Sequence, residues 1–269
     1  MIRISKRDLR LAGLAFAAAG SLVAATYLLS LVFAPPVDMA QAIKVPPDVA
    51  VRRSQVENTI FGTADVAPFF ERLHILLPAD YDAAIRKAAT TEAGSATDTP
   101  DYWLSDAVKI VRQSHGALAA KADAGPLSDI FARQADVLSA LSAKDARLCV
   151  DFLYGGASEG FFAFASENRA LVGALAIAGL EAIASGQDKK IERGPPTDED
   201  FQLLETALRE KGLDAAEIGA LLDGKSPEPP LPDARLCEMG RIYLAAIASL
   251  PEETRLRLYS LAVGLMARS

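Results

Sequence analysis

Apolar residues recur every three or four positions along most of the chain after residue 50, and this spacing predicts α-helices. No segment shows the sustained alternation of apolar and polar residues that indicates a strand. Two clear apolar series are Val66, Phe70, Leu73 and Leu77, and Leu104, Val108, Val111, His115 and Leu118. The pattern therefore predicts an all-α fold.

Residues that favour helix ends agree with this spacing. Thr99 precedes Pro100, and Thr197 precedes three acidic residues that suit the positive end of a helix dipole. Gly212 and Gly224 indicate helix ends. The predicted helices cover residues 64–76, 80–93, 100–122, 127–143, 145–154, 166–185, 198–211, 214–222, 234–249 and 252–267.

The longest apolar segment covers residues 11–34, in which the phenol of Tyr27 is the one ionisable group. As a helix it is about 36 Å long, which is enough to cross a bilayer. Residues 1–10 carry four basic residues and one acidic residue, so the positive-inside rule places this tail in the cytoplasm. We therefore predict a single-pass anchor in a bacterial inner membrane, with the rest of the chain in the periplasm.

The anchor is expected to remain uncleaved. Residues 40–42 read Ala-Gln-Ala, a pattern that signal peptidases accept, and a cleaved signal peptide is the alternative. The apolar run is longer than the roughly 7 to 15 residues of a signal-peptide core. Four prolines then predict a stiff spacer over residues 35–50, followed by one helical domain over residues 51–269.

The run from Ala170 to Leu180 is apolar on every side but too short to span a bilayer by itself. Such a run is typical of the central helix of a bundle, so the predicted helix 166–185 is expected to be the most buried element. Residues 186–197 and 223–233 are polar, proline-rich breaks that indicate surface loops.

Composition excludes some classes of protein. Hydrophobic residues make up 51% of the chain and charged residues 23%, which excludes wholesale disorder. The formal net charge of −7 argues against nucleic acid as the main partner.

The two cysteines lie in the same five-residue context, Asp-Ala-Arg-Leu-Cys, at Cys149 and Cys237. In both copies the aspartate is a plausible helix cap, so each cysteine is expected in the first turns of a helix. An even number of cysteines outside the cytoplasm favours a disulfide between them over two free thiols.

The sequence predicts neither a metal site nor a cofactor. His74 and His115 are the two histidines, and together with the cysteines they are scattered singly rather than in the close pairs of zinc sites. Both histidines also fall on apolar helical stripes. No phosphate-binding loop, dinucleotide fingerprint or calcium loop occurs in the sequence.

A G-x-S-x-G motif at residues 156–160 contains Ser158 and Glu159. In α/β-hydrolases the histidine of the triad follows the serine, whereas both histidines here precede Ser158, so that fold is excluded. A partly buried Glu159 is a candidate general acid of the kind that peptidoglycan hydrolases use. We favour a purely structural interpretation of residues 155–160, in which they form a glycine-rich connection between two helices.

The sequence thus favours a membrane-anchored periplasmic helical domain that binds a protein partner or another component of the cell envelope. The alternative is an envelope hydrolase with Glu159 as general acid. A cleft with Glu159 at its base and an aromatic wall from Tyr154, Phe161 or Phe162 would favour the enzyme.

Overall fold

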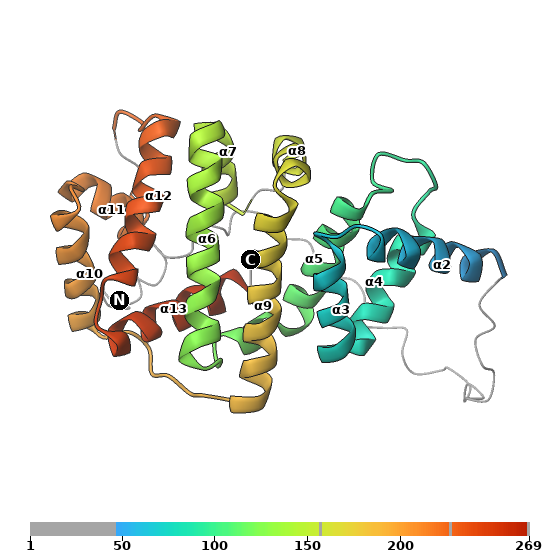
Figure 1. Ribbon diagram of the computed structural model, residues 1–269. Helices are drawn as coiled ribbons and strands as arrows, with labels where there is room; N and C mark the ends of the chain where they lie inside the picture. Colours follow the sequence, from blue (N-terminus) through green and yellow to red (C-terminus); the bar gives the residue numbers. More distant parts are fainter. Residues whose placement is uncertain (1–46, 156–157, 226–227, 268–269) are drawn as a thin grey trace, which may run out of the picture.

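A computed structural model describes residues 47–155, 158–225 and 228–267, which form twelve α-helices and no strand. The prediction of an all-α fold is therefore confirmed for these residues (Figure 1). The predicted anchor, residues 11–34, lies outside the described residues. The helices are α2 (Pro47–Phe61), α3 (Ala67–Leu76), α4 (Pro78–Thr90), α5 (Pro100–Ala119), α6 (Ala124–Lys144), α7 (Ala146–Leu153), α8 (Glu159–Glu167), α9 (Arg169–Lys189), α10 (Asp198–Glu210), α11 (Ala215–Asp223), α12 (Asp233–Ala248) and α13 (Glu252–Met266).

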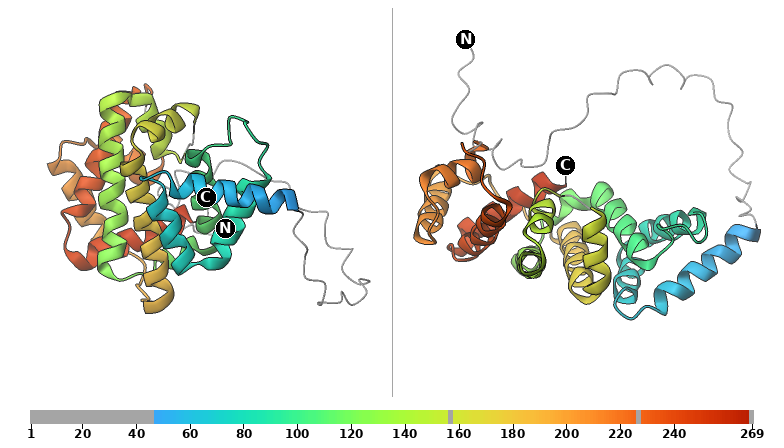
Figure 2. Two further views of the ribbon diagram at one scale, coloured as in Figure 1. Left: turned by 45° about the vertical axis from the view of Figure 1, so that its right-hand side comes forward. Right: turned by 90° about the horizontal axis from the view of Figure 1, so that it is seen from above.

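The helices lie side by side in a row rather than around one axis. Helices α2 to α5 form one end of the row, α6, α7 and α9 the middle, and α10 to α12 the other end (Figure 1). The last helix, α13, crosses behind the row and packs against α5, α6 and α12. Seen from above, the row follows a shallow arc (Figure 2).

Most helices begin and end where the sequence predicts. The Thr99 hydroxyl caps α5 by accepting a hydrogen bond from the Tyr102 amide. At α10, the Thr197 side chain accepts from the Asp200 amide while the Asp200 carboxylate accepts from the Thr197 amide, which completes a capping box. Gly212 and Gly224 have positive φ angles of 91° and 66° and end α10 and α11.

The structure differs from the predicted boundaries in three places. Helix α2 begins at Pro47, so residues 47–50 are helical and do not belong to the predicted spacer. The predicted helix 166–185 is the junction of two helices, because the backbone leaves helical geometry at Asn168. The Asn168 side chain donates to the carbonyl of Phe164 and so binds the last turn of α8. Helix α8 occupies most of the stretch between the predicted helices 145–154 and 166–185, where no helix is predicted.

The expectation that the predicted helix 166–185 is the most buried element is wrong. Six of the 21 residues of α9 are buried, against five of the 13 in α10. Helix α9 packs against α3, α5, α6 and α8, but it lies in a row of helices and not inside a closed bundle. Side chains such as Leu171, Val172 and Leu175 are therefore only half-buried.

Among the described helices, α9 is the one that is long and apolar enough to cross a membrane by length and composition, with a mean hydropathy of 1.5. Helix α9 has 21 residues and extends beyond the apolar run from Ala170 to Leu180, which is too short to span a bilayer by itself. It packs against four neighbouring helices, and 33% of its apolar window is buried.

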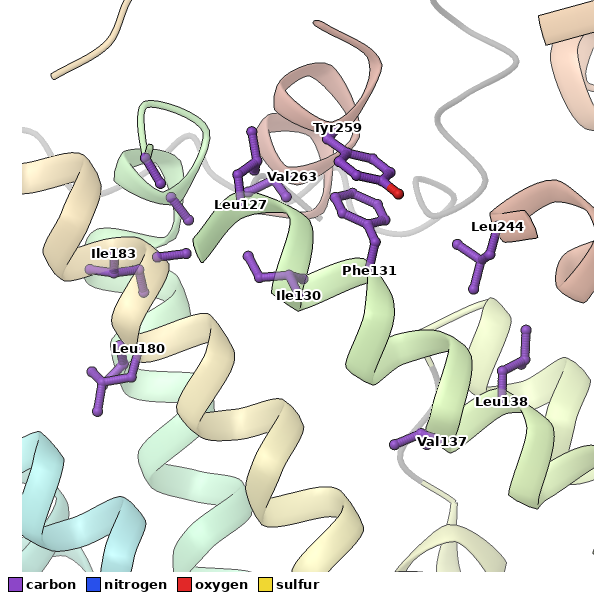
Figure 3. Close-up of a cluster of buried hydrophobic side chains, with 14 of the residues drawn as sticks. Leu127, Ile130, Phe131, Val137, Leu138, Leu180, Ile183, Leu244, Tyr259 and Val263 are labelled. Atoms are coloured by element: carbon purple, nitrogen blue, oxygen red, sulfur yellow. The ribbon is translucent and has the colours of Figure 1, made fainter. Parts of the chain in front are cut away.

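The hydrophobic core runs through the whole row, from Val56 in α2 to Val263 in α13. Its centre lies on α6, where Leu127, Ile130 and Phe131 face α9 and α13 (Figure 3). The Phe131 ring stacks on Tyr259 of α13, with ring centroids 3.7 Å apart. Because α6 contacts α7, α9, α12 and α13, this cluster joins the middle of the row to its C-terminal end.

A buried carboxylate connects α10 to α13. The Asp200 side chain is 2% exposed and accepts hydrogen bonds from Arg257 Nε at 2.8 Å and Nη2 at 2.6 Å. The Thr254 hydroxyl donates to it at 2.6 Å, and the Thr197 amide at 2.7 Å. These donors, with Arg257 the most important, hold the pKa of Asp200 well below its usual range. The carboxylate is thus fully paired and stays charged.

The backbones of α9 and α5 approach closely at Gly186. A Cβ atom at this position would lie 2.6 Å from the carbonyl carbon of Leu118 and closer still to its oxygen. Backbone atoms cannot rotate away as a side chain does, so Gly186→Ala is expected to separate the two helices and to cost at least about 1 to 3 kcal/mol of unfolding free energy.

A matched control lies in the same helix. At Gly179 an added Cβ meets no atom within 4 Å, so Gly179→Ala is expected to stabilise the protein by about 0.4 to 1 kcal/mol. Urea unfolding measured by circular dichroism compares both variants with the wild type. Equal effects of the two substitutions would contradict the close approach at Gly186.

Candidate functional site

Ser158 and Glu159 form the start of α8. The Ser158 hydroxyl accepts a hydrogen bond from the Phe161 amide at 3.3 Å, so this serine is the N-cap of the helix. Glu159 occupies the first turn, where a negative charge is favourable, and it is exposed. The preceding segment from Cys149, whose apolar sequence also fits a strand, belongs to helix α7 as far as Leu153. Both residues therefore have a local role in starting a helix.

The three aromatic candidates do not form one wall. Phe162 stacks on Tyr102 with centroids 4.2 Å apart, while Phe161 lies 5.7 Å from Phe152. Tyr154 is the residue after α7 and is 44% exposed. Phe161 and Phe162 thus pack α8 against α7 and α5 respectively.

The histidines lie apart. The His74 ring stacks on Tyr81 with centroids 4.5 Å apart, and His115 Nε2 lies 2.9 Å from Asp80 Oδ2. Within the described ranges, no group of three or more histidine, cysteine or acidic side chains has the proximity that a metal ion needs.

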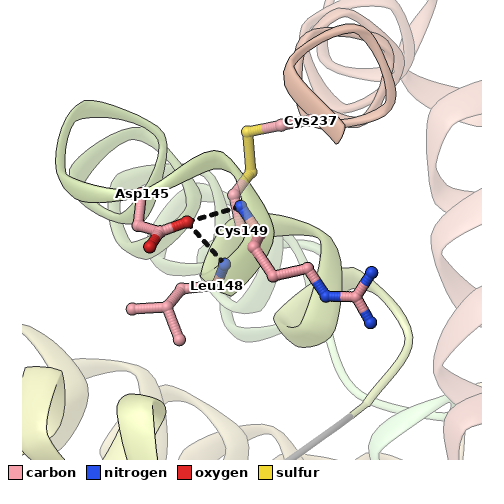
Figure 4. Close-up of a disulfide and its surroundings, with 5 residues drawn as sticks. Asp145, Leu148, Cys149 and Cys237 are labelled. Carbon is pink, nitrogen blue, oxygen red and sulfur yellow. Dashed lines mark hydrogen bonds between the residues drawn. A yellow bond between two sulfur atoms is a disulfide. The ribbon is translucent and has the colours of Figure 1, made fainter. Parts of the chain in front are cut away.

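Cys149 and Cys237 form a disulfide that joins α7 to α12 (Figure 4). Their Cα atoms are 5.6 Å apart, within the range that a disulfide needs. Asp145 caps α7 by accepting from the amides of Arg147 and Leu148, whereas the cap position of α12 is Pro232, so the repeated aspartate caps only the first helix. Both cysteines are buried. The predicted pairing is confirmed.

An open groove of about 490 Å³ lies between α6, α12 and α13. The lining residues of α6 and of α12 are three or four positions apart, so each set lies on one face of its helix. Many of these side chains are small, which leaves space between the two helices. Residues of α6 and α12 in the lining are Ser128, Phe131, Ala132, Ala135, Ser139, Arg241, Leu244, Ala245 and Ala248. Arg255 and Tyr259 of α13 complete it, and none of the aromatic candidates Tyr154, Phe161 and Phe162 lines it. The groove is therefore an apolar trough with a few polar groups.

Several polar groups of the groove have N–H or O–H donors that are not used in hydrogen bonds within the described chain. Arg241 is exposed and has no ion pair or hydrogen bond with any described residue. Arg255 uses Nη1 on the carbonyls of Ala248 and Leu250, which leaves its Nε and Nη2 hydrogens available. Tyr259 is 3% exposed, and its hydroxyl has no described partner.

The electrostatics of the groove favour an anion. Two arginines line it, and its lining contains no carboxylate. Burial raises the pKa of the Tyr259 hydroxyl, an effect that the nearby charge of Arg255 partly offsets, so this group is a neutral donor at physiological pH. The groove thus offers an apolar surface together with guanidinium and hydroxyl donors for an anionic group.

Sequence reasoning missed this groove. Its signal is the series Arg241, Leu244, Ala245 and Ala248, in which a cation and alanines share the face of one helix. Such a series is indistinguishable from an ordinary core stripe until the facing helix is known.

Comparisons of the chain with known protein families, with curated proteins and with solved structures found no match. The class of the protein therefore rests on its own structure. The described residues define an all-α protein with a buried disulfide and an apolar, cation-lined groove between helices.

Proposed function

We propose that the protein is a single-pass anchored helical domain on the periplasmic side of a bacterial inner membrane, where it binds a partner protein or another envelope component. The groove between α6, α12 and α13 carries the binding role, because Arg241 and the Tyr259 hydroxyl have no partner in the described chain and Arg255 keeps donors available beside an apolar trough.

Two observations support the location. Residues 11–34 are uncharged and come directly after a basic tail, which favours a span with its N-terminus in the cytoplasm. The disulfide between Cys149 and Cys237 is the kind of bond that persists in oxidising compartments such as the periplasm. The lipid bilayer is then the first partner, through residues 11–34.

No observation favours the alternative proposal, an envelope hydrolase. Glu159 is exposed at the start of α8 and does not line the groove. The aromatic side chains near it pack against other aromatic side chains. The binding role therefore has the stronger support.

Reporter fusions test the topology. Alkaline phosphatase fused after residue 50 is expected to be active, because the basic tail keeps the N-terminus in the cytoplasm and the chain beyond the anchor is exported. A fluorescent protein that folds only in the cytoplasm, fused at the same position, is expected to be dark. An inactive phosphatase together with a fluorescent fusion would refute the location.

Crosslinking in intact cells and isolation of the full chain test the binding role. A reproducible crosslinked species that contains residues of the groove is expected. If every crosslink involves the anchor alone, the binding role of the helical domain is wrong.

A further inference from the structure

We propose that the groove between α6, α12 and α13 binds a single-chain amphiphile with an anionic headgroup, either a carboxylate or a phosphate. This inference rests on the proposed binding role and names the ligand class. It does not depend on which side of the membrane the domain occupies.

The shape of the groove fits an apolar chain. Its lining on α6 runs from Ser128 to Ser139, three turns of helix or about 16 Å. The volume of about 490 Å³ lies within the range of small-molecule sites. Spread over about 16 Å, the volume of about 490 Å³ gives the trough a mean cross-section of roughly 30 Å², smaller than that of a helix roughly 10 to 12 Å across. A chain fits into it, whereas a partner helix would rest on its rim.

The floor of the groove is apolar and the space is made by small side chains. Ala132 and Ala135 of α6 face Ala245 and Ala248 of α12. Below them, the stacked rings of Phe131 and Tyr259 close the trough. Burial of methylene groups against this floor supplies the favourable free energy of the apolar part of the ligand.

The charges fit an anionic headgroup. Arg241 lies toward one end of the trough and Arg255 toward the other, where it binds the carbonyl of Ala248. Between Arg241 and Ala248, α12 rises by about 10 Å. Guanidinium groups bind carboxylates and phosphates through paired hydrogen bonds, and no acidic side chain of the lining competes for them.

An independent observation comes from Tyr259. Its ring is buried and the residue is 3% exposed, while its hydroxyl has no hydrogen-bond partner in the described chain and is accessible from the groove. The hydroxyl therefore presents a hydrogen-bond donor to whatever occupies the groove. Figure 3 shows the hydroxyl extending from the stacked rings toward the side on which Leu244 lies. An oxygen of a ligand headgroup in the groove would accept its hydrogen bond.

Photolabelling of the full chain in phosphatidylcholine nanodiscs tests the inference. The probes are dodecanoate and dodecyl phosphate, each with a diazirine on the chain, and the matching neutral dodecanol. After irradiation and tryptic digestion, label is expected in the peptides of residues 134–144 and 242–255, which contain the facing lining residues of α6 and α12. Labelling by the better anionic probe is expected to exceed that by the alcohol by about tenfold or more, the effect of one charge-assisted contact.

Two variants with matched controls locate the site. Ala245→Trp fills the trough from an exposed position and is expected to abolish labelling of peptide 134–144, whereas Ala170→Trp, at an exposed alanine of α9, leaves it unchanged. Arg241→Gln is expected to reduce labelling of peptide 134–144 by the anionic probes toward that of the alcohol; this peptide is the readout because the substitution removes the tryptic site before residue 242. Arg209→Gln, at an exposed arginine of α10 outside the groove, leaves it unchanged. Circular dichroism and thermal melting establish that each variant is folded.

A stronger signal from dodecanoate identifies a fatty-acid type of headgroup, and a stronger signal from dodecyl phosphate identifies a lipid-phosphate type. Equal labelling by the alcohol and the anions, or unchanged labelling of a folded Ala245→Trp protein, would overturn the inference. Crosslinking of an acidic protein through the groove, with no labelling by either anion, would overturn the ligand class and leave the binding role standing. A cytoplasmic location in the reporter fusions would overturn the proposed topology alone.

Discussion

Replacing Cys149 and Cys237 by alanine is expected to lower the free energy of unfolding by about 4 to 5 kcal/mol, an upper figure from the chain-entropy argument. The two residues are 88 positions apart, so the bond removes much of the freedom of the unfolded chain. It also joins α7 to α12, two helices that the row brings together from distant parts of the sequence.

Urea unfolding of the oxidised protein and the variants measures this effect. Each single replacement is expected to cost as much as the double replacement, since either one removes the bond. Reductant is expected to destabilise the wild-type protein by a similar amount and to leave the double variant unchanged. A wild-type protein whose unfolding does not respond to reductant would show that the bond contributes nothing.

Replacing Asp200 by asparagine is expected to cost about 3 to 5 kcal/mol, because it leaves the guanidinium of Arg257 without its buried partner. The loss also weakens the capping box of α10, since the same carboxylate accepts from the Thr197 amide. The exposed Asp198 in the same helix turn is the control, and Asp198→Asn is expected to change stability by less than about 0.5 kcal/mol. Equal effects of the two replacements would contradict this role of Asp200.

Asp200 also gives the stability a defined dependence on pH. Its pKa in the folded protein lies below the value of about 3.9 in an unfolded chain, chiefly because Arg257 donates to the carboxylate. Its contribution is therefore complete above about pH 4 and is lost as the pH falls toward the folded pKa. Melting temperatures measured between about pH 7 and pH 2 are expected to fall less steeply below pH 4 in a folded Asp200→Asn protein than in the wild type.

The candidate site shows what sequence reasoning could weigh and what it missed. The G-x-S-x-G motif offered Ser158 and Glu159 as weak candidates, although a glycine-rich connection between helices was the favoured interpretation. The structure uses Ser158 as the cap of α8, a role that depends only on residues within one helix turn. The groove instead needs Ala132 and Ala245, which lie in different helices and carry no chemical signature of their own.

The sequence by itself determined the helical class, most helix boundaries and the pairing of the cysteines. Helix formation depends on contacts three or four residues apart and on caps such as Thr99 and Thr197, so it can be read locally. The cysteine pairing could be predicted because the chain has only two.

Tertiary structure alone decided the rest. It broke the predicted helix 166–185 at Asn168, left α9 half-exposed in an open row, and brought Arg257 to Asp200 across 57 positions. It also set α6 against α12 so that their alanines leave a groove. Apolar periodicity predicts which face of a helix is buried. It does not predict which element covers that face, because burial is favourable against any complementary apolar surface.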